Sequence, residues 1–374
     1  MKITKILFQA CMVSALAYTG SAYASNVNEK LYDLHKRLQK IETESKTQKT
    51  VKQEAPQSES SGNVHIHGLV EVEYGYSEDY GMVDSSDIVL ATVELGIDAK
   101  INNNVDIFIG LLHEEDDTPL EVDVGVINLH DNSPMAASLG QMYVPFGAYE
   151  THVVSDPLTL ELGETRESAI LFNFEANGAT AGFYLFNPDL GVGADEDKAT
   201  AFGVSLGFAN DNFSAGVDYI SSIADTDAVQ DHLMNGPPAI IALADQVAGL
   251  SVHAAMNMNN FAMVLEYVGA LDQFAPAEIS FGGVGAEPSA MNLEFAVSFP
   301  MGAREGTLAV AYQATDEAVE LGLPETRAII AVSTEIYDAT SLAFEYFRDT
   351  DYDAADGGTE ETSDVFTIQL ATEF

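Results

Sequence analysis

Carboxylates are the side chains in this sequence whose type and spacing most clearly predict chemistry. The chain holds 59 Asp and Glu against 15 Lys and Arg, which gives a formal net charge of −44. Many acids occupy every second position of alternating segments and so share one face of a strand. Carboxylates on a wall that faces water attract cations and repel small anions. We expect these charged side chains to line a channel or contact its solute: Glu71, Glu73, Glu94, Asp98, Arg166, Asp218, Glu266, Glu294, Arg327 and Glu335.

Two histidines at the start of the first alternating segment are candidate metal ligands. His65 and His67 are two positions apart and therefore point to the same face of a strand. With a nearby carboxylate they would suit a transition metal, because imidazole is a good ligand for such ions. The alternative is a pair of solvated histidines at the rim, since two ligands alone do not make a site.

An acidic segment near the C-terminus resembles a calcium-binding loop in its spacing. Its acids Asp349, Asp351, Asp353 and Glu360 fall at positions 1, 3, 5 and 12 of such a loop. Position 6 is Ala354, where a calcium loop needs glycine for its sharp turn. A hydrated acidic surface loop is therefore the favoured interpretation.

The composition and motifs argue against several other functions. The only adjacent acid–histidine pair is Asp231-His232, and the sequence contains no Gly-x-Ser-x-Gly elbow. Cys11 is the single cysteine, which excludes a disulfide scaffold and a cysteine zinc site. We predict that the protein is not an enzyme and has no cofactor. Nucleic acid is not an expected partner, because its phosphates would be repelled.

The first 62 residues have the composition of three successive segments: a signal peptide, a short helix and a flexible linker. Lys2 and Lys5 precede an apolar stretch and the small-residue site Ala22-Tyr23-Ala24, which predicts a signal peptide over residues 1–24. A heptad pattern predicts a short coiled-coil helix over residues 25–43, and residues 44–62 read as a flexible linker. We expect self-association through residues 26–43, with a lone docking helix as the alternative. The heptad positions are Val27, Leu31, Leu34, Leu38 and Ile41.

From residue 63 to residue 374 the hydrophobic period changes from the helical spacing to two. In the first segment Val64, Ile66, Val70 and Val72 share one face, and the histidines and glutamates share the other. The same alternation places Val89, Val93 and Leu95 on an apolar face. The last segment alternates in the same way and ends on Phe374, an ending typical of bacterial outer-membrane strands.

The connections distinguish a membrane barrel from a soluble sandwich. Short polar turns alternate with longer acidic loops, which predicts sixteen antiparallel strands closed into a transmembrane β-barrel. We therefore expect the bacterial outer membrane as its location, and lipid and lipopolysaccharide as its surroundings. The loops are expected near residues 77–87, 114–121, 145–167, 187–199, 222–249, 270–289, 315–325 and 349–364.

Two of the long loops are candidates to narrow the pore. The loop 145–167 contains Pro145-Phe146-Gly147, and the loop 222–249 contains the mostly apolar segment 237–244. Each could fold into the lumen as a constriction, and the second could equally form a lid over the rim. A barrel of about sixteen strands is wide enough to leave an aqueous channel around such a loop.

The segment Gly140-Gln141-Met142-Tyr143-Val144-Pro145-Phe146-Gly147, followed by residues 155–166, resembles the LbtU-type siderophore porin family. The resemblance implies a signal peptide, a short coiled coil and a sixteen-stranded outer-membrane barrel. It also implies uptake of a ferric polycarboxylate siderophore without energised gating. The alternatives are a general diffusion porin that prefers cations, and a surface adhesin or structural barrel. An acidic lumen suits a polycarboxylate poorly unless iron, or a basic patch at Arg166 and Arg327, offsets the charge.

Overall fold

The structure is a computed structural model that describes residues 63–374 except 116–117, 132, 193–198, 237–238, 241 and 303. The predicted signal peptide, coiled-coil helix and linker lie outside the described residues. Among the described residues, no helix is both long enough and apolar enough to cross a bilayer.

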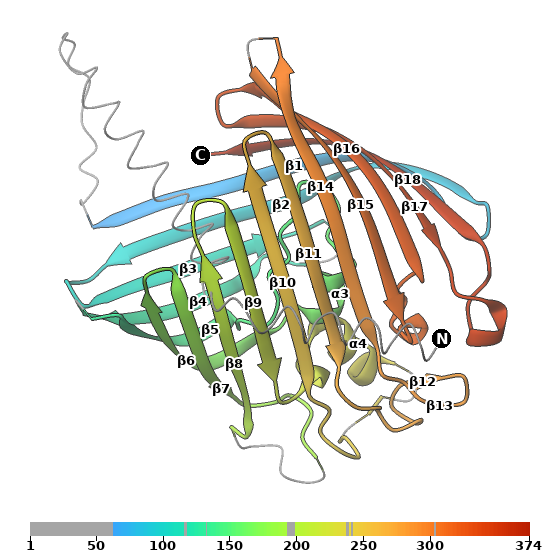
Figure 1. Cartoon of the computed structure of the whole chain (residues 1–374), viewed down its shortest axis with the longest axis horizontal. Helices are drawn as coiled ribbons and strands as arrows, with labels where there is room; N and C mark the ends of the chain where they lie inside the picture. Colours follow the sequence, from blue (N-terminus) through green and yellow to red (C-terminus); the bar gives the residue numbers. More distant parts are fainter. Residues whose placement is uncertain are drawn as a thin grey trace.

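Sixteen antiparallel strands form one closed barrel, which confirms the predicted fold class (Figure 1). The first eight strands are β1 Val64–Glu78, β2 Asp84–Lys100, β3 Val105–His113, β4 Glu121–His130, β5 Met135–Tyr143, β6 Arg166–Ala176, β7 Ala179–Phe186 and β8 Ala201–Ala209. The others are β9 Phe213–Ile220, β10 Gly249–Met258, β11 Phe261–Ala270, β14 Ser289–Met301, β15 Arg304–Asp316, β16 Thr326–Tyr337, β17 Thr340–Thr350 and β18 Thr362–Glu373.

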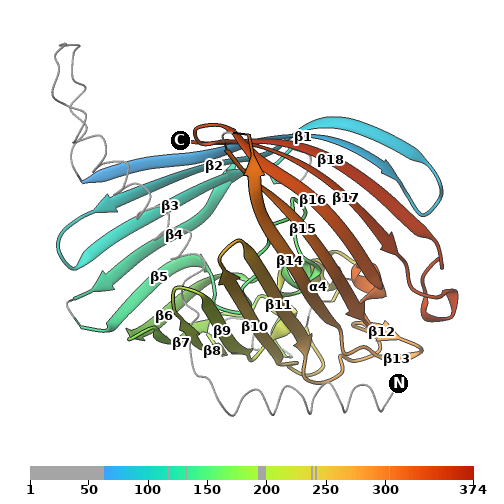
Figure 2. The ribbon, with the colours of Figure 1, turned by 45° about the horizontal axis from the view of Figure 1, so that its top comes forward.

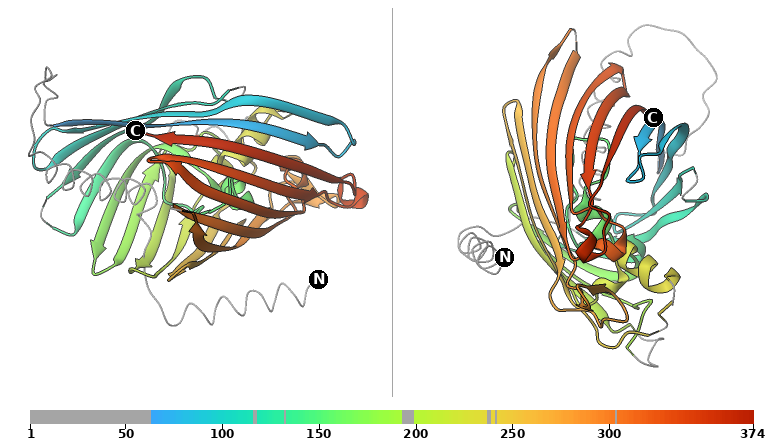
Figure 3. Two further views of the ribbon diagram at one scale, coloured as in Figure 1. Left: turned by 90° about the horizontal axis from the view of Figure 1, so that it is seen from above. Right: turned by 90° about the vertical axis from the view of Figure 1, so that its right-hand side faces the viewer.

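The barrel closes where its last strand meets its first (Figure 3). Strand β18 pairs with β1 over ten residues, from Leu69 opposite Glu373 to Glu78 opposite Asp364. Beyond the paired strands, the backbone amide of Phe374 donates to the carbonyl oxygen of Gly68 at 3.1 Å, and the reverse bond has the same length. The C-terminal alternation thus supplies the strand that leaves the sheet without an open edge.

The outer wall of the barrel is apolar because each strand alternates. In β6, Ile170, Phe172 and Phe174 are exposed, while Ala169 and Leu171 between them are buried in the interior. Outward apolar residues recur around the ring, among them Leu206, Leu265, Phe295, Val310, Ile330, Phe344 and Leu370. Such an outer face fits the hydrocarbon of a bilayer, where every backbone polar group must be paired within the protein.

One predicted face assignment is wrong, and a register shift explains it. Strands β1 and β2 pair regularly up to Glu71 opposite Thr92, and the next pair is Glu73 opposite Val89. The extra residue in β2 reverses the alternation on one side of the shift. Val89 therefore shares a face with Glu73, whereas Ile88 takes the outward position and is 69% exposed.

Tight turns lie at one end of the barrel and long loops at the other, as the sequence indicates. The turn between β6 and β7 holds Asn177 and Gly178, both with positive φ, as a two-residue hairpin of this kind requires. The predicted loop 77–87 is shorter than expected, because β1 extends to Glu78 and β2 already begins at Asp84. In outer-membrane barrels the short turns face the periplasm and the long loops face outward.

Two of the long loops, between β5 and β6 and between β9 and β10, pack against one side of the barrel interior. Besides the strands of the barrel, the long loops contain α3 Leu158–Gly163, η1 Ile223–Asp225, α4 Asp227–Asn235, β12 Ser280–Phe281, β13 Val284–Gly285, η2 Val319–Leu321 and η3 Ala354–Asp356. Figure 2 shows α4 within the ring of strands. Leu158, Leu162, Val229 and Leu233 are fully buried and join one apolar cluster with residues of the wall from β4 to β14. The open side of the lumen is therefore the one lined by β15–β18 and β1–β3.

Candidate pore constriction

The segment 144–165, between β5 and β6, runs through the barrel interior and binds the opposite wall. Its residues contact strands β9, β11, β14, β15 and β17 in turn through hydrogen bonds. The expectation that the 145–167 loop folds into the lumen is confirmed. The 222–249 loop contributes α4, which packs on α3, and the backbone amide of Asp227 donates to the carbonyl oxygen of Glu164 at 2.9 Å.

Glu266 on β11 is the main acceptor for this loop. Its side chain is fully buried and takes the backbone amides of Ala148 and Tyr149, at 2.5 and 3.0 Å, on its two oxygens. The hydroxyl of Thr159 donates a third bond at 3.0 Å. Hydrogen bonds to an ionised acceptor are about twice as strong as neutral ones. One wall carboxylate therefore fixes both the start of the loop and the first turn of α3.

Glu294, on the neighbouring strand β14, has the same role. Its buried carboxylate accepts the Thr151 hydroxyl, the His152 backbone amide and the His152 Nδ1–H group, each at 2.7 Å. Three more wall side chains hold the loop: Asp218 accepts the Gly147 amide, Gln313 the Leu158 amide, and Glu345 the Val154 and Ser155 amides.

Asp218, Glu266 and Glu294 thus lie on the inner wall but have no exposure to water. We name the four wall carboxylates Asp218, Glu266, Glu294 and Glu345 the clasp. Their carboxyl oxygens are directed at backbone amides of the loop rather than at a solute. Three of them, Asp218, Glu266 and Glu294, are sequence-predicted channel residues, and they bind the constriction instead of lining open water.

Three of the remaining predicted carboxylates, Glu71, Glu73 and Glu94, lie on β1 and β2. The charges of Glu73 and Glu94, and that of Asp156 in the loop, act on Glu71. The other two lie elsewhere: Asp98 is 3.2 Å from His67, and Glu335 pairs with Arg304. Both the loop and the wall formed by β1 and β2 therefore carry acidic groups.

A cavity of about 270 Å³ continues below the loop on the open side of the lumen. The loop contributes His152, Val153 and Val154 to its lining, and the wall contributes Glu305 and Glu335. Hydroxyl, amide and methyl groups complete the lining: Thr307, Ala331, Ser333, Thr334, Ser341, Ala343 and Gln369. Gln369 also donates to Glu73 of β1 at 2.8 Å, which joins the cavity to the acidic wall.

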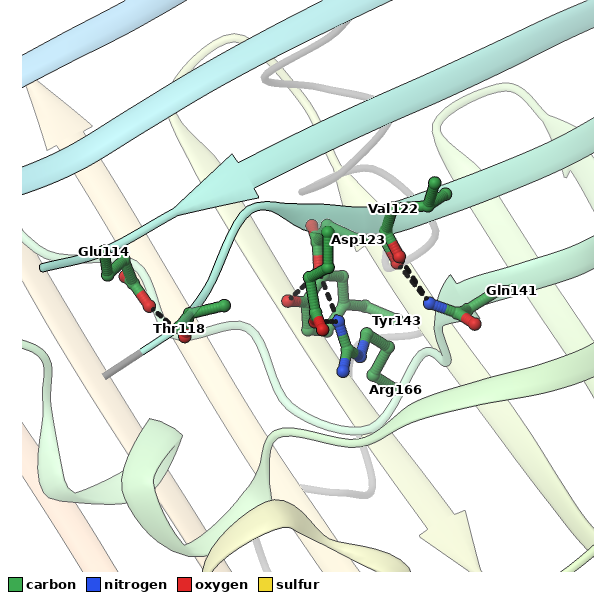
Figure 4. Close-up of polar contacts among 8 residues, drawn as sticks. Glu114, Thr118, Val122, Asp123, Gln141, Tyr143 and Arg166 are labelled. Atoms are coloured by element: carbon green, nitrogen blue, oxygen red, sulfur yellow. Dashed lines mark hydrogen bonds and ion pairs between the residues drawn. The ribbon is translucent and has the colours of Figure 1, made fainter. Parts of the chain in front are cut away.

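Arg166 and Arg327, the predicted basic patch, are both neutralised by neighbours. Arg166 contacts Glu121 and Asp123 of β4 at 2.5 and 3.1 Å, and Tyr143 donates to the same Asp123 (Figure 4). Arg327 makes a two-pronged bond to Asp349, at 2.8 and 3.0 Å, and its guanidinium lies over the Phe347 ring.

The other two arginines of the described chain are paired as well. Arg304 contacts Glu335 and Asp338 at the turn end of the barrel, and Arg348 contacts Asp364. In the described residues, therefore, each guanidinium already has a carboxylate partner.

The predicted metal ligands lie at the turn end of the barrel, near the start of β1. His67 Nε2 is 3.2 Å from a carboxylate oxygen of Asp98, and its ring stacks on Phe108. His65 stands opposite Asp98 in the pairing of β1 with β2. Within the ranges that the structure describes, no three His, Cys, Asp or Glu side chains gather in a way that could hold a metal ion. Asp349 of the calcium-like segment is occupied by Arg327.

Glu164 directly follows α3 at the loop end of the pore, and its carboxyl group is a weaker acid than usual. Burial, followed by the charges of Asp227 and Asp156, raises its pKa from 4.5 to about 8. Asp227 at the start of α4 also has a raised pKa, about 6, mainly because it is buried. The contact between the two inward loops therefore contains carboxyl groups that resist ionisation.

Replacing Glu164 with glutamine should make this contact less sensitive to pH. A carboxyl whose pKa is raised on folding stabilises the protein below its unfolded pKa and loses that contribution as the pH rises through the folded pKa. The affected window runs from about 4.5 to about 8. We expect the melting temperature of the native barrel to fall between pH 5.5 and pH 8.5, and that of E164Q to fall less. The exposed Glu175 gives the matched control E175Q, and an equal fall in E164Q would contradict the assignment.

Relatives of this chain occur in Legionella, although no family model matches it. A UPF0422 protein of Legionella pneumophila (strain Paris) is 31% identical over 290 residues, which cover 71% of this chain and 55% of the relative. The chain thus spans about half the length of the relatives it matches.

Two solved structures show the same fold. The anion-selective porin from Comamonas acidovorans has a TM-score of 0.59 and 14% identity, covering 83% of this chain and 99% of the porin. The outer-membrane channel DcaP of Acinetobacter baumannii has a TM-score of 0.56 and 12% identity, covering 86% of this chain and all of the channel. This chain is an outer-membrane β-barrel with the porin fold.

Proposed function

We propose that the protein is a passive diffusion channel of the outer membrane that prefers small cationic solutes. The observation that carries this proposal is the cluster of acids between the loop and the wall, where the charges of Asp156, Glu73 and Glu94 all act on Glu71. Fixed charges of one sign in a narrow pore with low-dielectric walls concentrate the opposite ion. Rings of carboxylates are one of the ways in which channels select cations.

The clasp supports this proposal. It explains how the inner wall can hold many acidic side chains and still bind the loop. Amide groups of the loop, and His152, take up the charge of Glu266, Glu294 and Glu345. The acids that remain accessible to a solute, such as Glu305 and Glu335, are then those of the open side.

The narrower prediction, uptake of a ferric polycarboxylate siderophore, is the second candidate. It is favoured by the resemblance of residues 140–166, the segment that forms the constriction, to the siderophore porins. The ion pairs of Arg166 and Arg327 count against it, because each guanidinium would have to leave a carboxylate to bind an anionic complex.

Charge removal at the constriction tests the first candidate. The variant Glu71→Gln/Asp156→Asn should lower the potassium-over-chloride permeability ratio roughly fivefold or more, since each of the two charges contributes about 0.5–1 kcal/mol. The measurement is the reversal potential of the refolded protein in planar bilayers under a salt gradient. Asp211, in a turn between β8 and β9, provides the control D211N, for which the ratio should stay unchanged. A native channel that prefers chloride would refute the proposal.

The same bilayers discriminate between the two candidates. A ferric polycarboxylate complex added at micromolar concentration should leave the current of a general cation channel unchanged. Saturable block that the arginine variants R166Q or R327Q abolish would instead favour the siderophore candidate.

A further inference from the structure

His152 occupies a distinctive place in the constriction. It is the residue of the loop that the clasp binds through both backbone and side chain, since Glu294 accepts its amide and its Nδ1–H at 2.7 Å. Its imidazole also lines the cavity below the loop, where its side chain is 31% exposed. One edge of the ring is thus held in the wall while the side chain borders the ion path.

The bond to Glu294 decides which nitrogen can titrate. An ionised carboxylate only accepts hydrogen bonds, so Nδ1 must carry the proton that it shares with Glu294. Protonation of the ring then takes place at Nε2, the nitrogen on the other side of the ring. A positive charge gained there stands in the same cavity as the carboxylates of Glu305 and Glu335.

We propose that His152 makes the cation preference of this channel depend on pH: the imidazolium partly cancels the charge of the acidic lining, and the neutral ring does not. The inference rests on the proposed function, because it concerns the regulation of the same constriction. It requires no movement of the loop, since Nδ1 stays bonded to Glu294 in both protonation states.

The charged groups around His152 all favour its protonated form. The hydrogen bond to Glu294, and then the charges of Glu294 and Glu150, raise the pKa of His152 above its ordinary value of 6.5, against an opposing effect of burial. The switch therefore lies at a higher pH than that of an ordinary histidine. The carboxylates that border the ring or its cavity are Glu150 of the loop, Glu294 on β14, Glu305 on β15, Glu335 on β16, with its partner Arg304, and Glu345 on β17.

The test is the permeability ratio of the full-length refolded channel between pH 5.5 and pH 8.5. In His152→Asn, the side-chain amide can replace Nδ1–H as donor to Glu294 but cannot titrate. We expect the potassium-over-chloride ratio of the native channel to rise about twofold to threefold over this range. The ratio of H152N should exceed the native ratio at pH 5.5 and should change less over this range, in which the buried carboxyl of Glu164 also titrates. His113, at the end of β3 with Nδ1 2.9 Å from the Thr118 carbonyl oxygen, gives the control H113N, which should follow the native curve.

The outcomes separate this inference from the proposal on which it rests. An H152N channel that keeps the native pH dependence would overturn the role of His152 while leaving cation preference intact. A native channel without cation preference at pH 8.5 would overturn both. Equal single-channel conductance of native and H152N channels at pH 8.5 is also expected, and a change there would mean that His152 only positions the loop.

Discussion

Replacing Glu266 with leucine should open the pore. Three donors of the loop, the Ala148 and Tyr149 amides and the Thr159 hydroxyl, lose their acceptor. Each unsatisfied buried donor costs about 1–3 kcal/mol. The apolar contacts of the buried side chains Leu158 and Leu162 remain and contribute about 1.5–3 kcal/mol each. Glu294 and Glu345 also still bind the middle of the loop. The loss at Glu266 should therefore release the start of the loop and α3 for part of the time, while the middle of the loop stays bound.

The readout is single-channel conductance, for which we expect at least a doubling, with added open-channel noise, in E266L. Asp211 supplies the control, because it lies in the turn between β8 and β9 rather than on the wall that binds the loop. D211N should keep the native conductance. An E266L channel with native conductance and noise would show that the other clasp bonds and the apolar contacts suffice to hold the loop.

Replacing Gly140 with alanine should prevent the barrel from closing normally. Gly140 has a φ of +139°, and a Cβ built there lies 2.0 Å from the carbonyl oxygen of Gly125. Strand β4 would have to move away from β5 at the pair formed by Val126 and Gly140. Strained backbone of this kind costs about 1–3 kcal/mol even before the strands separate.

Folding yield, measured as the fraction of heat-modifiable protein on gels of unboiled samples, tests this expectation. G140A should lose most of the folded band. Gly75 on β1 is the control, because a Cβ there has nothing within 4 Å, and G75A should fold as the native chain does. Native yield in G140A would mean that the sheet absorbs the displacement.

Most of the fold could be predicted because a barrel wall is a local pattern repeated many times. Alternation assigned Val64, Ile66 and Val72 to the outer face, where all three are more than a third exposed. The error at Val89 arose because a single extra residue in β2 shifts the register without leaving any composition signal. The end of β1 was missed because Ser77 and Glu78 are as polar as a loop, although they pair with Ser85 and Asp84.

The candidate site was less predictable. The odd or even position of a carboxylate along a strand gives the face on which it lies, but it does not show whether a loop covers that side chain. Glu266 and Glu335 have the same sequence signature, yet one is fully buried under the loop and the other lines open space. The partners of Arg166 lie two strands away on β4, and only the finished register brings them together. No sequence motif singled out His152. Its importance follows from its two hydrogen bonds to Glu294, which only the structure shows.

The clasp has a consequence for how such a pore can diversify. It binds the loop mostly through main-chain amides, which every residue except proline provides. Exchanging side chains such as Val153 or Asp156 therefore leaves the anchoring unchanged while altering what a solute meets. Selectivity can then drift between lineages by single substitutions in the loop, at little risk to folding, whereas the wall carboxylates are constrained to stay.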